Sequence, residues 1–129
     1  AKIASQLLKT RPLRLAFDQL LVGGAVPPIF QEPCCLSKVC SIQGVVGGLV
    51  LTLDSDGKAG GGVYFDGQHS FDFRPFFHDE LQRFLLIAYA KPRAVYVFNE
   101  GDPHVNHLKT LGYELGDTLK DDRHPIVYR

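Results

Sequence analysis

The segment NEGDPHVNH, residues 99–107, brings together side chains that could do chemistry. His104 and His107 are three residues apart, so on a helix their side chains would share one face. That spacing suits two ligands of one metal ion, or an acid–base pair with Asp102 nearby. A metal site needs a third ligand, which the neighbouring positions do not specify. Histidines on a helix surface are usually solvated, so we expect no metal site here.

The three cysteines, Cys34, Cys35 and Cys40, fall within one short stretch. An odd number of clustered cysteines does not fit the disulfide framework of a small secreted domain. Adjacent cysteines chelate zinc poorly, and the second ligand pair of a zinc site is missing. We expect free, buried thiols, with Cys40 inside a strand, and a reducing cytoplasm as the compartment.

Length and composition are those of an ordinary globular domain. The chain has 129 residues, of which 45% are hydrophobic and 22% are charged. Lys+Arg and Asp+Glu are both 14, and this zero net charge argues against a dedicated nucleic-acid-binding protein. The apolar runs are too short to span a bilayer, and the N-terminus lacks the apolar core of a secretory signal.

The first half of the chain predicts one helix followed by antiparallel strands. Apolar residues in LRLAFDQLLVGG recur at helical spacing, so we expect a helix over residues 13–22 that ends at Gly23–Gly24. Residues 38–73 contain apolar runs separated by Asp–Gly steps at 56–57 and 66–67. Asp–Gly favours tight hairpin turns, so this region predicts three or four antiparallel strands.

The second half predicts helices that alternate with strands. The run HDELQRFLLIAYA places Leu85 and its apolar neighbours on one stripe of a helix over residues 78–90. A continuous apolar strand follows over residues 93–99, and then a helix over residues 103–111 that ends at Gly112. The runs YELGDTL and HPIVYR close the chain as a strand pair. This order predicts an α+β domain with a mixed central sheet.

The last forty residues or so resemble the GNAT superfamily, the acetyl-CoA-dependent N-acetyltransferases. In that family a strand ends near an asparagine, a helix follows, and a glycine–aromatic step precedes the final strand pair. Here those parts are VYVFN ending at Asn99, the run HVNHLKTLG, and Gly112–Tyr113. The same joint is similar to one in small phage-encoded GNAT-like proteins, a virion protein among them. The resemblance implies one GNAT-like domain over residues 1–129.

The resemblance also implies where acetyl-CoA would bind. In the family, two parallel strands splay apart, and the pantetheine arm pairs with the freed backbone as an added strand would. A loop rich in glycine then cradles the pyrophosphate, and Asn99 could bond either the ligand or the neighbouring backbone. The cofactor-binding residues implied in this way are Arg74, Tyr96, Val97, Phe98 and Asn99.

Three features depart from the family pattern. Phe77 and Asp79 stand where the pyrophosphate loop has glycines, and their side chains would obstruct and repel phosphate. Leu108 stands where many members have a tyrosine that protonates the leaving thiolate. A short insertion also lengthens the segment between Asn99 and Gly112. The pattern therefore indicates a GNAT fold that has lost GNAT chemistry.

We therefore expect a phage-encoded, catalytically degenerate protein without a cofactor, which acts as a structural, virion or interaction protein. Its partner would be a protein rather than a nucleic acid or a membrane, in the host cytoplasm or the virion. The alternative is an active acetyl-CoA-dependent N-acetyltransferase, with Glu100, Asp102 or His104 as the base. The dense phenylalanines of residues 71–77 leave two interpretations, a partner-docking patch or, as we favour, part of the core.

Overall fold

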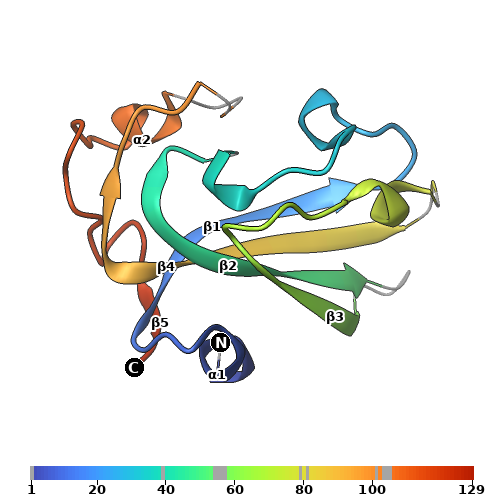
Figure 1. Cartoon of the computed structure of the whole chain (residues 1–129), viewed down its shortest axis with the longest axis horizontal. Helices are drawn as coiled ribbons and strands as arrows, with labels where there is room; N and C mark the ends of the chain where they lie inside the picture. Colours follow the sequence, from blue (N-terminus) through green and yellow to red (C-terminus); the bar gives the residue numbers. More distant parts are fainter. Residues whose placement is uncertain are drawn as a thin grey trace.

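A computed structural model describes residues 2–38, 40–53, 58–78, 80, 82–100, 102 and 106–129. These residues form a mainly-β domain, in which one five-stranded antiparallel sheet curls into a half barrel (Figure 1). The strands are β1 (Leu13–Val22), β2 (Ile42–Leu53), β3 (Ala59–Asp66), β4 (Arg83–Tyr96) and β5 (Ile126–Tyr128). Their order across the sheet is β3-β2-β4-β1-β5, so the long strand β4 is central.

The helices are all short and lie around the sheet. The two α-helices are α1 (Lys2–Leu8) and α2 (His107–Thr110). The 3-10 helices are η1 (Pro28–Phe30), η2 (Leu36–Lys38) and η3 (Arg74–Phe77). Within the described ranges, no helix has the length and apolar character needed to cross a bilayer.

The helix predicted over residues 78–90 is wrong, because residues 83–90 form the first half of β4. Phe84 and Leu86 are buried on the inner face of the sheet, whereas Leu85 is half-buried on the outer face. Both faces of this central strand are covered in part, so its sequence is a continuous apolar run without visible alternation. An apolar run of this length fits a helix or a strand equally well, which explains the error.

The helix predicted over residues 13–22 is also wrong, because the same residues form β1. Phe17 and Leu21 point to the inner side of the sheet, while Leu20 on the other side is 55% exposed. The helical spacing of the apolar residues is accidental here. The strand pairs with β4 from Arg14 to Val22, and those hydrogen bonds outweigh the local pattern.

The mixed GNAT-like sheet is wrong as well. Every neighbouring pair in the described sheet is antiparallel, so the strand predicted over residues 93–99 belongs to the antiparallel strand β4 as far as Tyr96. The predicted helix over residues 103–111 is reduced to α2, and residues 103–105 lie outside the described part. The C-terminal strand pair is replaced by β5, which pairs with β1, and by an isolated bridge between Thr118 and Val95.

The hairpin predicted around the first Asp–Gly step agrees with the structure. Strands β2 and β3 pair antiparallel from Gly47–Asp66 to Leu53–Ala59. The turn residues 54–57 themselves lie outside the described part of the chain. A strong turn sequence between two apolar runs was enough to predict this pair.

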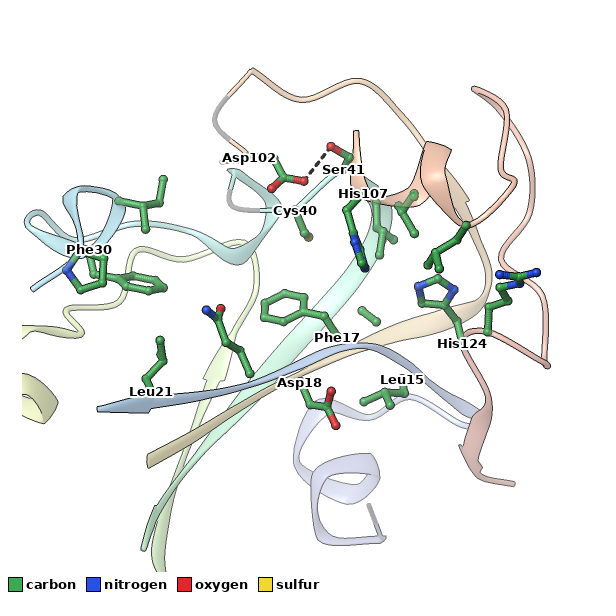
Figure 2. A pocket seen from close by; sticks show the side chains of 18 of the residues that line it. Leu15, Phe17, Asp18, Leu21, Phe30, Cys40, Ser41, Asp102, His107 and His124 are labelled. Carbon is green, nitrogen blue, oxygen red and sulfur yellow. Dashed lines mark hydrogen bonds between the residues drawn. The ribbon is translucent and has the colours of Figure 1, made fainter. Parts of the chain in front are cut away.

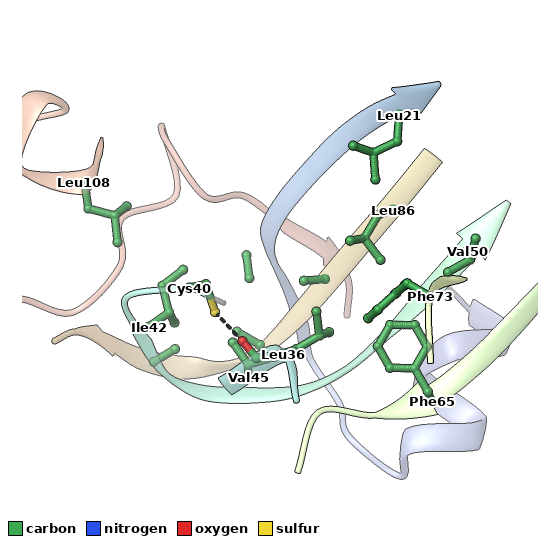
Figure 3. Packing of buried hydrophobic residues seen from close by; sticks show 14 of the residues in the cluster. Leu21, Leu36, Cys40, Ile42, Val45, Val50, Phe65, Phe73, Leu86 and Leu108 are labelled. Atoms are coloured by element: carbon green, nitrogen blue, oxygen red, sulfur yellow. Dashed lines mark hydrogen bonds between the residues drawn. The ribbon is translucent and has the colours of Figure 1, made fainter. Parts of the chain in front are cut away.

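The main core lies on the inner face of the sheet, under the segments that join β1 to β2 and β3 to β4 (Figure 3). Phe73 and Phe77 are 0% and 2% exposed, which confirms that the phenylalanine-rich segment belongs largely to the core. Phe30 from the other segment packs against Phe73 with its ring tilted, at 4.8 Å between ring centroids. Backbone hydrogen bonds between Cys34 and Phe71 tie the two covering segments together.

The outer face of the sheet is covered at one end by α1. Ala4 of α1 belongs to a small cluster with Leu13, Leu49 and Tyr89. The helix comes so close to β2 that a Cβ added at Gly47 would lie 2.5 Å from Leu8 Cδ2. Glycine at this position is therefore what allows α1 to pack on the sheet.

Candidate ligand-binding cavity

A cavity of about 660 Å³ lies beside β1 on the inner side of the sheet (Figure 2). Its walls come from β1, from residues 27–30 around η1, from residues 40–42 at the start of β2, and from α2 and residues 123–124. These segments are far apart in sequence, so the cavity is formed only when the sheet has curled.

The walls of the cavity are mostly apolar. Alternation along β1 turns Phe17 and Leu21 toward it, and η1 contributes Phe30. Leu108 and Leu111 of the α2 segment close the opposite side. An enclosure of this size and character is typical of sites that hold small molecules.

The cavity lies along an edge of β1 that is mostly uncovered by another strand. One edge pairs with β4 over the length of β1, whereas the other edge pairs with β5 only at Leu13 and Arg14. Consecutive residues such as Phe17 and Asp18 therefore both border the cavity.

One end of the cavity is polar, where Ser41, Asp102 and His107 meet the apolar wall (Figure 2). Ser41 is 2% exposed, and its hydroxyl donates a hydrogen bond of 2.9 Å to Asp102 Oδ2. His107 begins α2, and its ring faces the cavity. Of the two base candidates that the structure describes, Asp102 lines this cavity and Glu100 does not.

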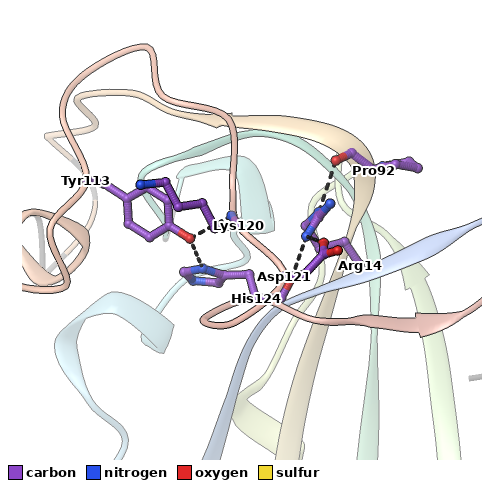
Figure 4. Close-up of polar contacts among 6 residues, drawn as sticks. All are labelled: Arg14, Pro92, Tyr113, Lys120, Asp121 and His124. Carbon is purple, nitrogen blue, oxygen red and sulfur yellow. Dashed lines mark hydrogen bonds and ion pairs between the residues drawn. The ribbon is translucent and has the colours of Figure 1, made fainter.

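His124 lies in the cavity wall and is 6% exposed. Its Nδ1 is 2.9 Å from the hydroxyl of Tyr113, which in turn accepts a hydrogen bond of 2.8 Å from the backbone N–H of Lys120 (Figure 4). The buried Tyr113 hydroxyl must place its own hydrogen on an acceptor, and Nδ1 is that acceptor. This network assigns the proton of the neutral imidazole to Nε2.

Arg14 holds the backbone that carries His124. Its buried guanidinium donates to the His124 carbonyl at 2.7 Å, to Asp121 Oδ1 at 2.7 Å and to the Pro92 carbonyl at 3.0 Å. Burial lowers the pKa of His124, and electrostatic interactions with Arg14 and His107 lower it further. His124 is therefore neutral at neutral pH, as the network with Tyr113 requires.

Asn99 has a structural role at the joint after β4. Its side-chain amide donates to the carbonyl of Ser37 at 2.6 Å and to that of Cys40 at 2.9 Å. Of the two roles predicted for Asn99, this is the bond to the neighbouring backbone. The side chain fixes η2 and the start of β2, and so it shapes the cavity wall at Cys40 indirectly.

The other residues implied by the resemblance do not form one site. Tyr96 is 4% exposed, and its backbone N–H donates to the Asp117 carbonyl. Val97 and Phe98 border a second hollow of about 530 Å³. Arg74 is exposed in η3 and donates to the carboxylate of Asp72. The described sheet also lacks the splayed parallel strands on which the pantetheine site depended.

Of the two further base candidates, only Glu100 lies in the described part of the chain. Glu100 is exposed and borders neither hollow. His104 lies outside the described residues, as does Asp79. In the described part of the chain, three or more His, Cys, Asp or Glu side chains nowhere gather into a possible metal site.

Cys40 lies in the cavity wall just before β2, rather than inside a strand as predicted. The three cysteines are free, and Cys40 is 6% exposed, which confirms a buried thiol at this position. Burial raises the pKa of Cys40 to about 12 and that of Cys34 to about 11. Neither thiol is activated as a nucleophile.

Sequence reasoning missed Ser41, Tyr113 and His124. Tyr113 was noted only as part of a glycine–aromatic step, and the other two carry no local motif. Their partners are up to 61 residues away along the chain, as for Ser41 and Asp102, so no spacing rule could pair them. Comparison of the chain with protein-family models, with curated proteins and with solved structures finds no match.

Proposed function

We propose that this domain binds a small, largely apolar molecule in the cavity beside β1. The observation that carries the proposal is an enclosure of about 660 Å³ with apolar walls and a few polar groups at one end. Small-molecule sites typically measure about 300–1,000 Å³ and have this division between apolar walls and a few orienting polar groups.

The polar groups favour binding over covalent catalysis. The Ser41 hydroxyl donates to a carboxylate, not to an imidazole that could accept its proton. The Cys40 thiol has a pKa raised to about 12 by burial and donates to the Leu36 carbonyl. Neither side chain is an activated nucleophile, so the polar end serves to orient a ligand.

A cavity-filling substitution tests the proposal. Calorimetric titration with 1-octanol should show binding to the wild-type protein, and Leu111→Trp should weaken it by about tenfold or more because the larger ring occupies the cavity. Leu115→Trp is the matched control, since Leu115 is 64% exposed and does not line the cavity. Equal affinities for the two variants would contradict the proposal. A parallel titration with acetyl-CoA tests the acetyltransferase alternative.

A second candidate function, the interaction role predicted from the sequence, is supported by the outer face of the sheet. Leu20 is 55% exposed and Val22 is 57% exposed, and Leu20 pairs with the half-buried Leu85 of β4. Leu51 continues this row on β2. An apolar row on an open sheet face favours contact with another apolar surface.

The charges that border this row favour a second copy of the chain as the partner. Asp18 and Arg83 occupy diagonal positions on either side of the Leu20–Leu85 pair. If two copies pack through this face about a two-fold axis, Asp18 of each copy can lie opposite Arg83 of the other. Light scattering should then show a dimer, and Leu20→Lys should convert it to a monomer. Val127→Lys, which changes another exposed residue, is the control and should remain a dimer. A wild-type protein that is monomeric at every concentration would exclude this candidate function.

A further inference from the structure

His124 presents an N–H group without a hydrogen-bond acceptor to the cavity. Nδ1 is occupied by the Tyr113 hydroxyl, which leaves the proton on Nε2. Nε2 makes no hydrogen bond to any described residue. The atom is not completely buried, and the ring that carries it borders the cavity. Largely buried N–H donors in folded proteins are normally hydrogen-bonded. This N–H therefore favours a ligand that places a hydrogen-bond acceptor beside it in the cavity.

Two guanidinium groups lie near this N–H, and each of them has a carboxylate partner. The Arg14 guanidinium is hydrogen-bonded to the carbonyl of the same residue at 2.7 Å, and Arg123 lines the cavity next to His124. His107 faces the cavity from α2. The contact of Arg123 Nε with Asp122 at 3.8 Å leaves the other N–H groups of this guanidinium able to donate to a ligand carboxylate.

Three of the nearby acidic side chains already have partners, and Asp18, which also borders the cavity from β1, carries its side chain on the opposite side of that strand from Phe17 (Figure 2). Asp121 is paired with Arg14 at 2.7 Å, and Asp122 lies 3.8 Å from Arg123 Nε. Asp102, which also borders the cavity, accepts the Ser41 hydroxyl. These pairs leave the N–H of His124 available to an acceptor from outside the chain.

From this geometry we infer that the ligand is an apolar monocarboxylate, whose carboxylate accepts a hydrogen bond from His124 Nε2 beside Arg123. Its hydrocarbon part lies against Phe17, Leu21 and Leu108. The inference rests on the proposed function and adds the chemical class of the ligand. A carboxylate suits the site better than a phosphate, because one N–H and one guanidinium match its two oxygens and single charge.

A matched pair of probes tests the inference in the wild-type protein. Octanoate and 1-octanol differ at the head group but share the same chain length. Octanoate should bind about tenfold or more tightly than 1-octanol, since a hydrogen bond to a charged acceptor in a largely buried site contributes at least that ratio. Octylamine, which brings a positive head group, should bind more weakly than both.

Two variants assign the preference to His124 and Arg123. His124→Phe should remove the preference for octanoate over 1-octanol, because it removes the N–H and keeps an aromatic ring. Thermal melts check that His124→Phe folds. Arg123→Gln alters an exposed side chain, so it should fold normally and should lower octanoate affinity selectively. His124→Gln retains an N–H donor and should keep part of the preference.

The outcomes separate this inference from the proposed function. Equal binding of octanoate and 1-octanol, or a preference that survives both His124→Phe and Arg123→Gln, would overturn the inference and leave the cavity as an apolar binding site. Stronger binding of octylamine would overturn it as well. Binding of neither octanoate nor 1-octanol would overturn the proposed function together with the inference.

Discussion

The Tyr113 hydroxyl lies 2.9 Å from His124 Nδ1, and it also accepts the backbone N–H of Lys120 at 2.8 Å. One hydroxyl thus closes the C-terminal loop over residues 113–124 and fixes the tautomer of a histidine in the cavity wall. Stability and binding are coupled at this point, because the same hydrogen bond serves both.

Tyr113→Phe should therefore destabilise the protein. The substitution leaves the Lys120 N–H and His124 Nδ1 without a shared partner, which should cost about 1–3 kcal/mol in the free energy of unfolding. Urea denaturation measures the change. Tyr128→Phe is the control. The Tyr128 ring is also half-buried, but its hydroxyl makes no hydrogen bond to the described residues. If both variants lost the same amount of stability, the Tyr113 network would not be the cause.

Stability should fall as the pH is lowered below about 6.5. Burial, Arg14 and His107 lower the pKa of His124 in the folded protein, while Asp122 opposes this weakly. The unfolded chain therefore binds the proton more readily than the folded one, so the free energy of unfolding falls from about pH 6.5 down to the folded pKa and changes little above that range.

Urea midpoints at pH 7.5 and pH 5.5 measure this dependence. His124→Gln should reduce the difference between the two midpoints, since the titrating group is gone. A wild-type difference that His124→Gln leaves intact would show that other groups cause it.

Leu86→Ala should be strongly destabilising. Leu86 is 0% exposed in the central strand β4, and deletion of a buried leucine side chain costs about 2–5 kcal/mol in the free energy of unfolding. Leu20→Ala removes the same atoms from a residue that is 55% exposed, so it should cost less than about 0.5 kcal/mol. Similar denaturation midpoints for the two variants would contradict the strand register.

Gly47→Ala should also destabilise the protein. The added Cβ would lie 2.5 Å from Leu8 Cδ2 and 2.5 Å from the Phe65 carbonyl, so α1 or β3 must shift, at a cost of about 1–3 kcal/mol. Gly60→Ala is the matched control, since a Cβ there meets nothing within 4 Å. If the thermal melts of the two variants coincide, α1 does not pack on β2 as described.

Some features of this protein followed from the sequence by itself. The hairpin of β2 and β3 was predictable because the turn and both apolar runs are local. The burial of Phe73, Phe77 and Cys40 was predictable because residue type alone favours it. In each case the determining interactions lie within a few residues, or belong to the side chain itself.

The tertiary structure alone decided that residues 13–22 and 83–90 are strands. The apolar runs of these two segments fit a helix or a strand equally well. The hydrogen bonds that decide between the two are those of β1 with β4 and of β4 with β2. The cavity follows from the same pairing, since the curl of the sheet brings β1 beside α2 and His124. Sequence spacing carries no information about contacts of this range, because they depend on how distant strands pair and bend.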